Sequence, residues 1–245
     1  WSNATIFTTL SPTKENYKPK NVVEMIRHLA DNWSMLGREQ INDELFSVAI
    51  AKIGPAIPRG IINGSGESDS ASVLQFIEGT LCNEFPMVSM TYHGGGYGPI
   101  ITDKYSDVIR GEWVVGQGPL YARISSYNET PKTSLFNRFT LNYSYDAKDD
   151  AHLGTIIRDA SNNAWCRISE RLCGTLDKGV IDSKYIHDDQ TAAYVADWMV
   201  GHFAIPSYSV QYAASPAVIT YLRLGDNLDI FDPDIKNGTQ KIRAT

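Results

Sequence analysis

The sequence contains few cysteines, no long apolar run and no excess of basic residues. Three cysteines among 245 residues are too few for a disulfide framework and suit a protein of a reducing compartment. No run of about 18 apolar residues occurs, so we expect no membrane-spanning helix. The 28 Asp and Glu residues outnumber the 22 Lys and Arg residues, and the formal net charge of −6 argues against a basic nucleic-acid-binding surface.

Sequence patterns that carry catalysis or metal binding are also missing. No histidine belongs to a His-x-Glu or His-Glu-x-x-His pattern, and Cys166 and Cys173 are too far apart for a Cys-x-x-Cys motif. Ser65 lies between glycines, but a complete Gly-x-Ser-x-Gly elbow is absent. We therefore expect no catalytic residue, no metal site, no cofactor and no enzymatic activity. The histidines are His28, His93, His152, His187 and His202.

Two segments share single features with ligand-binding loops. Gly94-Gly95-Gly96-Tyr97-Gly98-Pro99 is rich in glycine but lacks the Lys-Ser/Thr pair of a phosphate-binding loop, so we interpret it as a hairpin tip. An EF-hand loop starting at Asp232 would have Arg243 in place of its final Glu. We interpret the aspartates of this second segment as solvated turn residues: Asp226, Asp229, Asp232 and Asp234.

Helical patterns dominate the first part of the chain. Asn21 and Glu24 form a capping-box pattern ahead of an apolar stripe and predict a first helix. A second helix is expected from Asn42 and should end before Gly54-Pro55. A third is expected over about residues 70–81.

Strand patterns follow from residue 88 onward. We expect a hairpin between residues 88–92 and 97–101, with the glycines as its turn. The clearest strand covers residues 137–145, where the odd positions from 139 are aromatic or apolar, and it should pair with residues 155–158. Further strands are expected at residues 121–127, 208–212, 217–224 and 228–231.

Two helical segments are expected within this strand-rich part. Residues 189–203 carry apolar residues at spacings of three and four, and Asp188 or Asp189 begins the helix. Residues 163–173 fit either a loop or a short amphipathic helix with the apolar residues Trp165, Ile168 and Leu172.

A boundary is expected where helices give way to strands, near Gly116-Gln117-Gly118-Pro119. It would separate a mixed helical and hairpin module, residues 1–118, from a strand-rich module, residues 119–245. The composition, with 42% hydrophobic and 20% charged residues, suits one large or two small globular domains. The fold class indicated by these patterns is α+β.

The order of three stretches resembles the hub proteins of bacteriophage tails. These include the baseplate hub of contractile tails and the central tail-tip protein of long flexible tails. The first stretch runs from Phe76-Ile77-Glu78-Gly79 through Phe85-Pro86-Met87-Val88-Ser89 to Gly95-Gly96-Tyr97-Gly98-Pro99. The second comprises Tyr127-Asn128-Glu129 and Phe139-Thr140-Leu141-Asn142-Tyr143-Ser144-Tyr145. The third is the helix–proline–strand–turn–strand series of residues 185–232.

This resemblance implies a tail-tube-like module in the second half, a small β-barrel or sandwich with residues 189–203 as its flanking helix. It implies a structural, non-enzymatic virion protein that joins the tail tube to the distal tip or spike. Such hubs assemble as rings, commonly trimers, through which DNA passes without specific binding. The implied location is the virion tail of a phage or prophage, assembled in the bacterial cytoplasm.

Two alternatives are open from the sequence. A carbohydrate-binding or glycan-cleaving domain would use some of the 13 tyrosines with paired acids such as Asp149-Asp150 or Asp188-Asp189, although turn and N-cap roles also explain these acids. A secreted glycoprotein domain would explain six Asn-x-Ser/Thr triplets. The triplets begin at Asn3, Asn32, Asn63, Asn128, Asn142 and Asn237.

Overall fold

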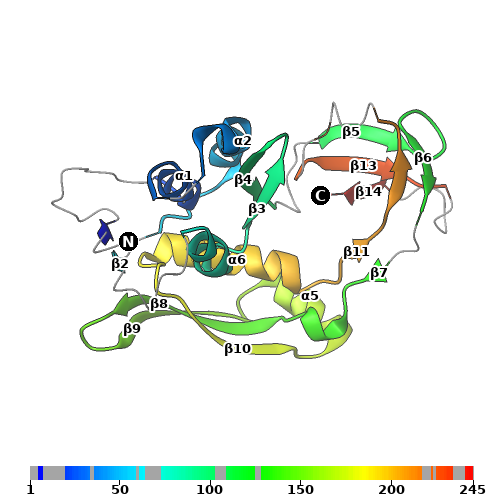
Figure 1. Ribbon diagram of the computed structural model, residues 1–245. Helices are drawn as coiled ribbons and strands as arrows, with labels where there is room; N and C mark the ends of the chain where they lie inside the picture. Colours follow the sequence, from blue (N-terminus) through cyan, green and yellow to red (C-terminus); the bar gives the residue numbers. More distant parts are fainter. Residues whose placement is uncertain are drawn as a thin grey trace. The chain divides into compact units, whose positions relative to one another are not determined.

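The chain is a mixed α+β protein, shown as a computed structural model in Figure 1. The structure describes residues 5–7, 20–33, 36–58, 61–63, 73–102, 109–124, 128–216, 222, 225–233 and 241–244. The chain forms two compact units. Unit 1 comprises Trp1–Ile101 with Phe136–Ala204, and unit 2 comprises Thr102–Leu135 with Ile205–Thr245. Among the described helices, none combines the length and apolar content needed to cross a bilayer.

These units differ from the predicted modules 1–118 and 119–245. Each unit is built from two separate stretches of chain, because strands distant in sequence pair with one another. Strand β13 (Asn227–Phe231) pairs in parallel with β5 (Ile109–Val114), across the predicted boundary. The glycine turn at residues 116–118 is therefore a connection inside unit 2 and not a boundary between units.

Unit 1 contains most of the helical structure. Its helical segments are α1 (Val22–Trp33), η1 (Arg38–Gln40), α2 (Asp43–Lys52), α3 (Val73–Phe76), η2 (Ile77–Leu81), α4 (Cys82–Glu84), α5 (Ala164–Cys173) and α6 (Asp189–Phe203). Its strands are β1 (Thr5–Phe7), β2 (Ile61–Asn63), β3 (Val88–His93), β4 (Gly96–Ile101), β8 (Arg138–Asp146), β9 (Ala151–Arg158) and β10 (Asp177–Asp182).

The predicted caps of the first two helices are present. The Glu24 amide donates to Asn21 Oδ1 at 3.0 Å, and the Glu24 carboxylate accepts from the Lys20 amide at 2.8 Å. Helix α2 begins after Asn42, whose Oδ1 accepts from two backbone amides of its first turn, and ends before Gly54-Pro55. These local hydrogen bonds explain why both helix starts are readable from the sequence.

The third helical segment extends further than predicted. Segments α3, η2 and α4 are consecutive, so helical backbone reaches residue 84 instead of 81, and residues 70–72 lie outside the described ones. Its middle part, η2, is a π-helical turn. Ile77, Leu81 and Phe85 are fully buried at spacings of four, which places one side of this segment in the core of unit 1.

A three-stranded sheet in order β10-β8-β9 forms the other side of unit 1. Strand β9 pairs with β8, as predicted, and the pairing is antiparallel, whereas β10 adds to β8 in parallel. Helix α6 lies along one face of this sheet (Figure 1). Phe139, Leu141 and Tyr143 of β8 are buried on this inner face, which confirms the predicted alternation.

The segment 163–173, for which the sequence allowed a loop or a short helix, forms helix α5. Asn163 caps it by accepting from the amides of Trp165 and Cys166. Cys166 and Ser169 are buried, but the apolar residues noted in the sequence are exposed. They are Trp165, Ile168 and Leu172.

Unit 2 consists of short strands around a small apolar core. Its described elements are β5, β6 (Leu120–Arg123), β7 (Asn128–Glu129), η3 (Lys132–Ser134), β11 (Tyr208–Ser209), β12 (Tyr212–Ala214), β13 and β14 (Lys241–Ala244). Pairing follows β14-β13-β5, β12-β6 and β11-β7. The buried core residues are Val115, Leu120, Leu228 and Ile230. Of the strand predicted at residues 217–224, only Leu222 lies within the described residues.

Candidate functional site

The glycine-rich segment is a hairpin turn packed against a helix, as interpreted from the sequence. Gly94 and Gly95 adopt positive φ angles of 61° and 84° between β3 and β4. A Cβ atom on Gly96 would lie 2.9 Å from the backbone nitrogen of Asn42. Asn42 also donates from Nδ2 to the His93 carbonyl at 2.8 Å. Gly96 thus permits close packing of β4 on α2, and Gly94 and Gly95 supply the turn.

The aspartates near the C-terminus differ in how deeply they are buried. Asp232 was expected to be a solvated turn residue, but it is 1% exposed. Its Oδ2 lies 3.5 Å from Arg123 Nη1 and accepts from Tyr212 Oη at 3.4 Å. The ion pair and hydrogen bond offset the cost of burying this carboxylate. Asp226 and Asp229 are half-buried, whereas Asp234 lies outside the described residues.

The histidines and cysteines do not assemble into a reactive cluster. Within the described ranges, no group of three His, Cys, Asp or Glu side chains is placed to hold a metal ion. His202 stacks on Trp198 with ring centroids 3.7 Å apart, and His152 lies against Tyr145. Burial raises the pKa of the Cys82 and Cys166 thiols to about 11 in each case, so both are protonated at neutral pH and are poor nucleophiles. Ser65 lies outside the described residues.

The paired acids have structural roles. Asp188 accepts from the Thr191 amide at 2.8 Å as the N-cap of α6, and Asp189 accepts from Tyr143 Oη at 2.7 Å. Asp150 accepts from Tyr145 Oη at 2.6 Å at the β8–β9 turn. These bonds agree with the turn and N-cap interpretation of the adjacent carboxylates.

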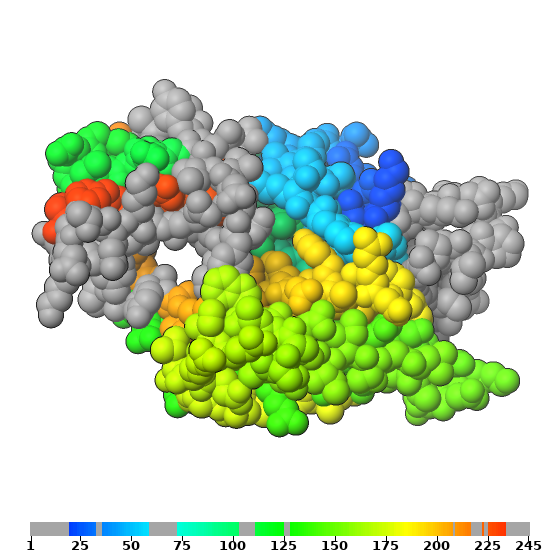
Figure 2. All heavy atoms as spheres, turned by 180° about the vertical axis from the view of Figure 1, so that it is seen from behind, coloured from blue at the N-terminus to red at the C-terminus, as the bar shows by residue number. Residues whose placement is uncertain are grey.

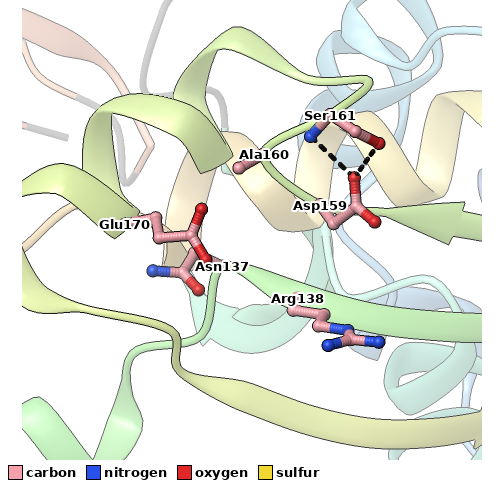
Figure 3. Close-up of a pocket in the computed structure, with 6 residues that line it drawn as sticks. All are labelled: Asn137, Arg138, Asp159, Ala160, Ser161 and Glu170. Carbon is pink, nitrogen blue, oxygen red and sulfur yellow. Dashed lines mark hydrogen bonds between the residues drawn. The ribbon is translucent and has the colours of Figure 1, made fainter.

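One polar hollow of about 200 Å³ lies where β8 begins (Figure 3). Its Asp159 carboxylate accepts from both the amide and the hydroxyl of Ser161, and these hydrogen bonds lower the pKa of Asp159. The amide of Asn137 is fully engaged, because Nδ2 donates to Ser169 Oγ and the Gly174 carbonyl while Oδ1 accepts from the Leu176 amide. Asn137 thereby fastens α5 to the start of β8, whereas the Asp159–Ser161 hydrogen bonds lie within the connection between β9 and α5.

The outer face of the β10-β8-β9 sheet, opposite α6, exposes apolar side chains. Val180, Thr140 and Ile157 form one cross-strand row there. Val180 is 61% exposed and Ile157 48%. Leu153, further along β9, is 72% exposed. Among the described strands, β9 and β10 each pair only with β8, so each presents an open edge.

Asn142 occupies the polar centre of this outer face. Its Nδ2 donates to Asp182 Oδ1 at 2.8 Å, and its Oδ1 accepts from Thr155 Oγ1 at 3.1 Å. This cross-strand chain of hydrogen bonds ties the three strands together. Since both ends of the amide are engaged, Asn142 is poorly suited to carry a glycan, although it starts one of the six triplets.

Comparison of the chain with models of known protein families and with curated proteins finds no match in either case. Sequence reasoning missed the outer face of the sheet, because strand alternation identifies which residues share a face but not which face a helix covers. Strand β10 was missed altogether, since Asp177, Lys178 and Gly179 interrupt any apolar alternation.

Proposed function

We propose that this chain is a structural subunit of a phage or prophage tail that joins the tail tube to the distal tip at the baseplate hub or tail tip. The order of the three sequence stretches supports this proposal. So does α6, which covers one face of a sheet as the flanking helix of a tail-tube-like module would. In this proposal the chain acts mechanically and has no catalytic residues.

One observation carries the proposal: α6 covers one face of the β10-β8-β9 sheet (Figure 1), and the opposite face exposes apolar side chains among the described residues. Its outer face exposes Leu153, Ile157 and Val180, and its described edges are unpaired. Open edges with exposed apolar side chains promote association, and native proteins usually cover them. Copies of the chain arranged in a ring would cover such a surface repeatedly.

The charge of the chain fits a conduit for DNA. A net charge of −6 disfavours persistent binding to phosphates, which a channel wall must avoid if DNA is to pass. The carbohydrate-binding alternative is not favoured by a specific observation. The polar hollow in Figure 3 is lined by no aromatic residue on which a sugar ring could stack.

The test is the molar mass of the purified chain by light scattering over a concentration series, with particles imaged by negative stain. We expect trimers or hexamers with a central hole wide enough for duplex DNA. Val180→Lys combined with Ile157→Lys places two charges on the outer face and should weaken assembly. Tyr92→Lys, at a residue that is 66% exposed on β3, is a control that adds one positive charge away from this face.

Closed particles without a central hole would contradict the proposed function. Assembly that is equally strong in the double variant and in the control would show that the outer face does not mediate it. Circular dichroism of each variant separates a weakened interface from a loss of folding.

A further inference from the structure

Helix α5 presents a second exposed apolar surface, at one end of the sheet. Trp165, Ile168 and Leu172 are 41%, 45% and 72% exposed, and their spacings place them on one side of the helix. Single exposed apolar residues are common, but three large ones on a ten-residue helix indicate a binding surface. We call these three residues the α5 stripe.

Basic residues border the α5 stripe. Arg171 follows Ile168 by three positions and so lies beside the stripe, whereas Arg167 lies one turn before Arg171 on the solvent side of the helix. Both are exposed, and Arg167 donates to the Ala160 carbonyl at 3.1 Å. In the described part of the chain, no carboxylate forms an ion pair with Arg171. A partner for this surface should therefore combine an apolar side chain with acidic groups.

The β8–β9 turn has this complementary chemistry. Asp146, Asp149 and Asp150 outnumber Lys148 there, and the turn residues 147–150 are exposed. Leu153, three residues after the turn, is 72% exposed on β9. The turn is held in shape, because Asp150 accepts from Tyr145 Oη and Asp146 accepts from the Lys148 amide at 2.9 Å. We call residues 146–153 the acidic tip.

The acidic tip and the α5 stripe lie at opposite ends of the same sheet. Asn137, at the start of β8, donates to Ser169 of α5, whereas the acidic tip follows the end of β8. A strand of nine residues spans roughly 30 Å, so the two surfaces cannot meet within one copy of unit 1. Figures 1 and 2 show the acidic tip projecting from the end of the sheet.

We propose that the α5 stripe binds the acidic tip of a second copy of this chain. Leu153 of one copy packs on Trp165, Ile168 and Leu172 of the next, and the aspartates of the tip face Arg167 and Arg171. Two different surfaces at opposite ends make a head-to-tail contact, which generates rings when the rotation closes. The inference rests on the ring assembly proposed above and adds a second contact to it, between the α5 stripe and the acidic tip, beside the outer face of the sheet.

The test uses two variants, each defective in one surface. Leu172→Glu places a charge in the α5 stripe, whereas Asp149→Lys with Leu153→Glu reverses a charge and removes the apolar residue of the acidic tip. Each variant alone should lose higher assembly, with self-association weakened about tenfold or more. An equimolar mixture should form dimers that grow no further, since one intact stripe meets one intact tip. Ile124→Glu, at an exposed residue of unit 2, is the control and should assemble as the wild type does.

The possible results distinguish a failure of the proposed head-to-tail contact from a failure of the proposed tail function. If wild-type chain and both variants form the same rings, the inference is wrong while the proposed tail function stands. A wild type that stays monomeric by analytical ultracentrifugation at high concentration also overturns the inference. Wild-type assembly into particles without a central hole contradicts the tail function, whatever the variants do. Equal melting temperatures of the variants exclude misfolding as the cause of any loss.

Discussion

At the residue scale, packing of unit 1 depends on the absence of side chains at the β3–β4 hairpin. Gly96 approaches the start of α2 so closely that a Cβ atom would lie 2.9 Å from Asn42 N and 3.0 Å from Asn42 Cβ. Backbone and a short side chain cannot yield as a long flexible side chain can. The hairpin and α2 are therefore held at a fixed distance by the glycine, together with the hydrogen bond from Asn42 N to the Tyr97 carbonyl at 2.9 Å.

We expect Gly96→Ala to destabilise the fold by about 1–3 kcal/mol, because the added methyl group forces α2 and β4 apart. The matched control is Gly79→Ala in η2, where a Cβ atom would meet no other atom within 4 Å. Alanine is the better helix former, so the control should be neutral or stabilising by up to about 1 kcal/mol. The free energy of unfolding of both variants is measured with urea. Equal changes in the two variants would contradict the close-packing argument.

A second prediction at this scale concerns Cys82. Burial, and secondarily the negative charge of Glu78, raises the pKa of its thiol to about 11. Only the thiolate reacts with iodoacetamide, so we expect alkylation of Cys82 to be slow at pH 8 and to accelerate with pH beyond pH 9. A short peptide with an ordinary cysteine pKa of about 8.5 is the control and should level off earlier. The rate is followed by mass spectrometry of the folded protein, and a plateau at pH 9 for Cys82 would contradict the prediction.

At the scale of elements, one carboxylate connects the helical part of unit 1 with the segment that leads into α6. Glu84, the last residue of α4, accepts from Ser183 Oγ at 2.5 Å and from the amides of Lys184 and Tyr185 at 3.1 and 2.9 Å. Glu84 is about 100 positions away from its three partners, so these hydrogen bonds hold two distant parts of the chain together. Hydrogen bonds to a charged acceptor are stronger than neutral ones.

We expect Glu84→Gln to lower the free energy of unfolding by about 1–3 kcal/mol, because the amide has lost the charge and one of the two acceptor oxygens. Glu129→Gln, at an exposed carboxylate of β7 in unit 2, removes the same charge and should change stability little. Chemical denaturation followed by circular dichroism compares the two variants. A loss of similar size in both would indicate a general effect of net charge and not the bonds of Glu84.

The elements readable from the sequence are those whose signals are local. The caps Asn21, Asn42 and Asp188 act within one helical turn, and the alternation of β8 and the glycine turn of β3–β4 need no distant partner. Other features depend on residues far away in sequence. The parallel pairings β10-β8 and β13-β5 and the π-helical turn η2 are of this kind, and none was predicted. A division into two parts was predicted, but the way each unit combines two separate stretches of chain was not.

The candidate surfaces could not be predicted from the sequence, because they too depend on residues that are distant in the chain. Trp165, Ile168 and Leu172 fit the pattern of a helix that buries its apolar side, yet α5 instead buries Cys166 and Ser169. Asn137 explains this choice, because its side chain binds Ser169 and the end of α5 and fixes which side of the helix meets the sheet. Which side of α5 is left exposed therefore depends on a residue 32 positions away from Ser169.

At the scale of the whole molecule, the formal net charge of −6 is the sum of regions of opposite sign. The acidic tip is negative, and the solvent side of α5 carries arginines. The acidic tip and the arginines of α5 are both exposed, so their attraction acts through water and is weakened by salt. The apolar part of the proposed contact is not screened in this way. The salt dependence of assembly therefore distinguishes a charge-assisted head-to-tail contact from association through apolar surface alone.

We expect self-association of the wild-type chain to weaken severalfold when sodium chloride is raised from about 0.05 to 0.5 M, since the Debye length falls from roughly 14 to 4 Å. Sedimentation velocity at several salt concentrations gives the dissociation constants. Arg171→Gln should associate more weakly at low salt and show a smaller dependence on salt, because one of the screened charges is gone. Assembly that strengthens steadily with salt in both proteins would assign the contact to apolar surface, and would remove the aspartates of the acidic tip and the arginines of α5 from the interface.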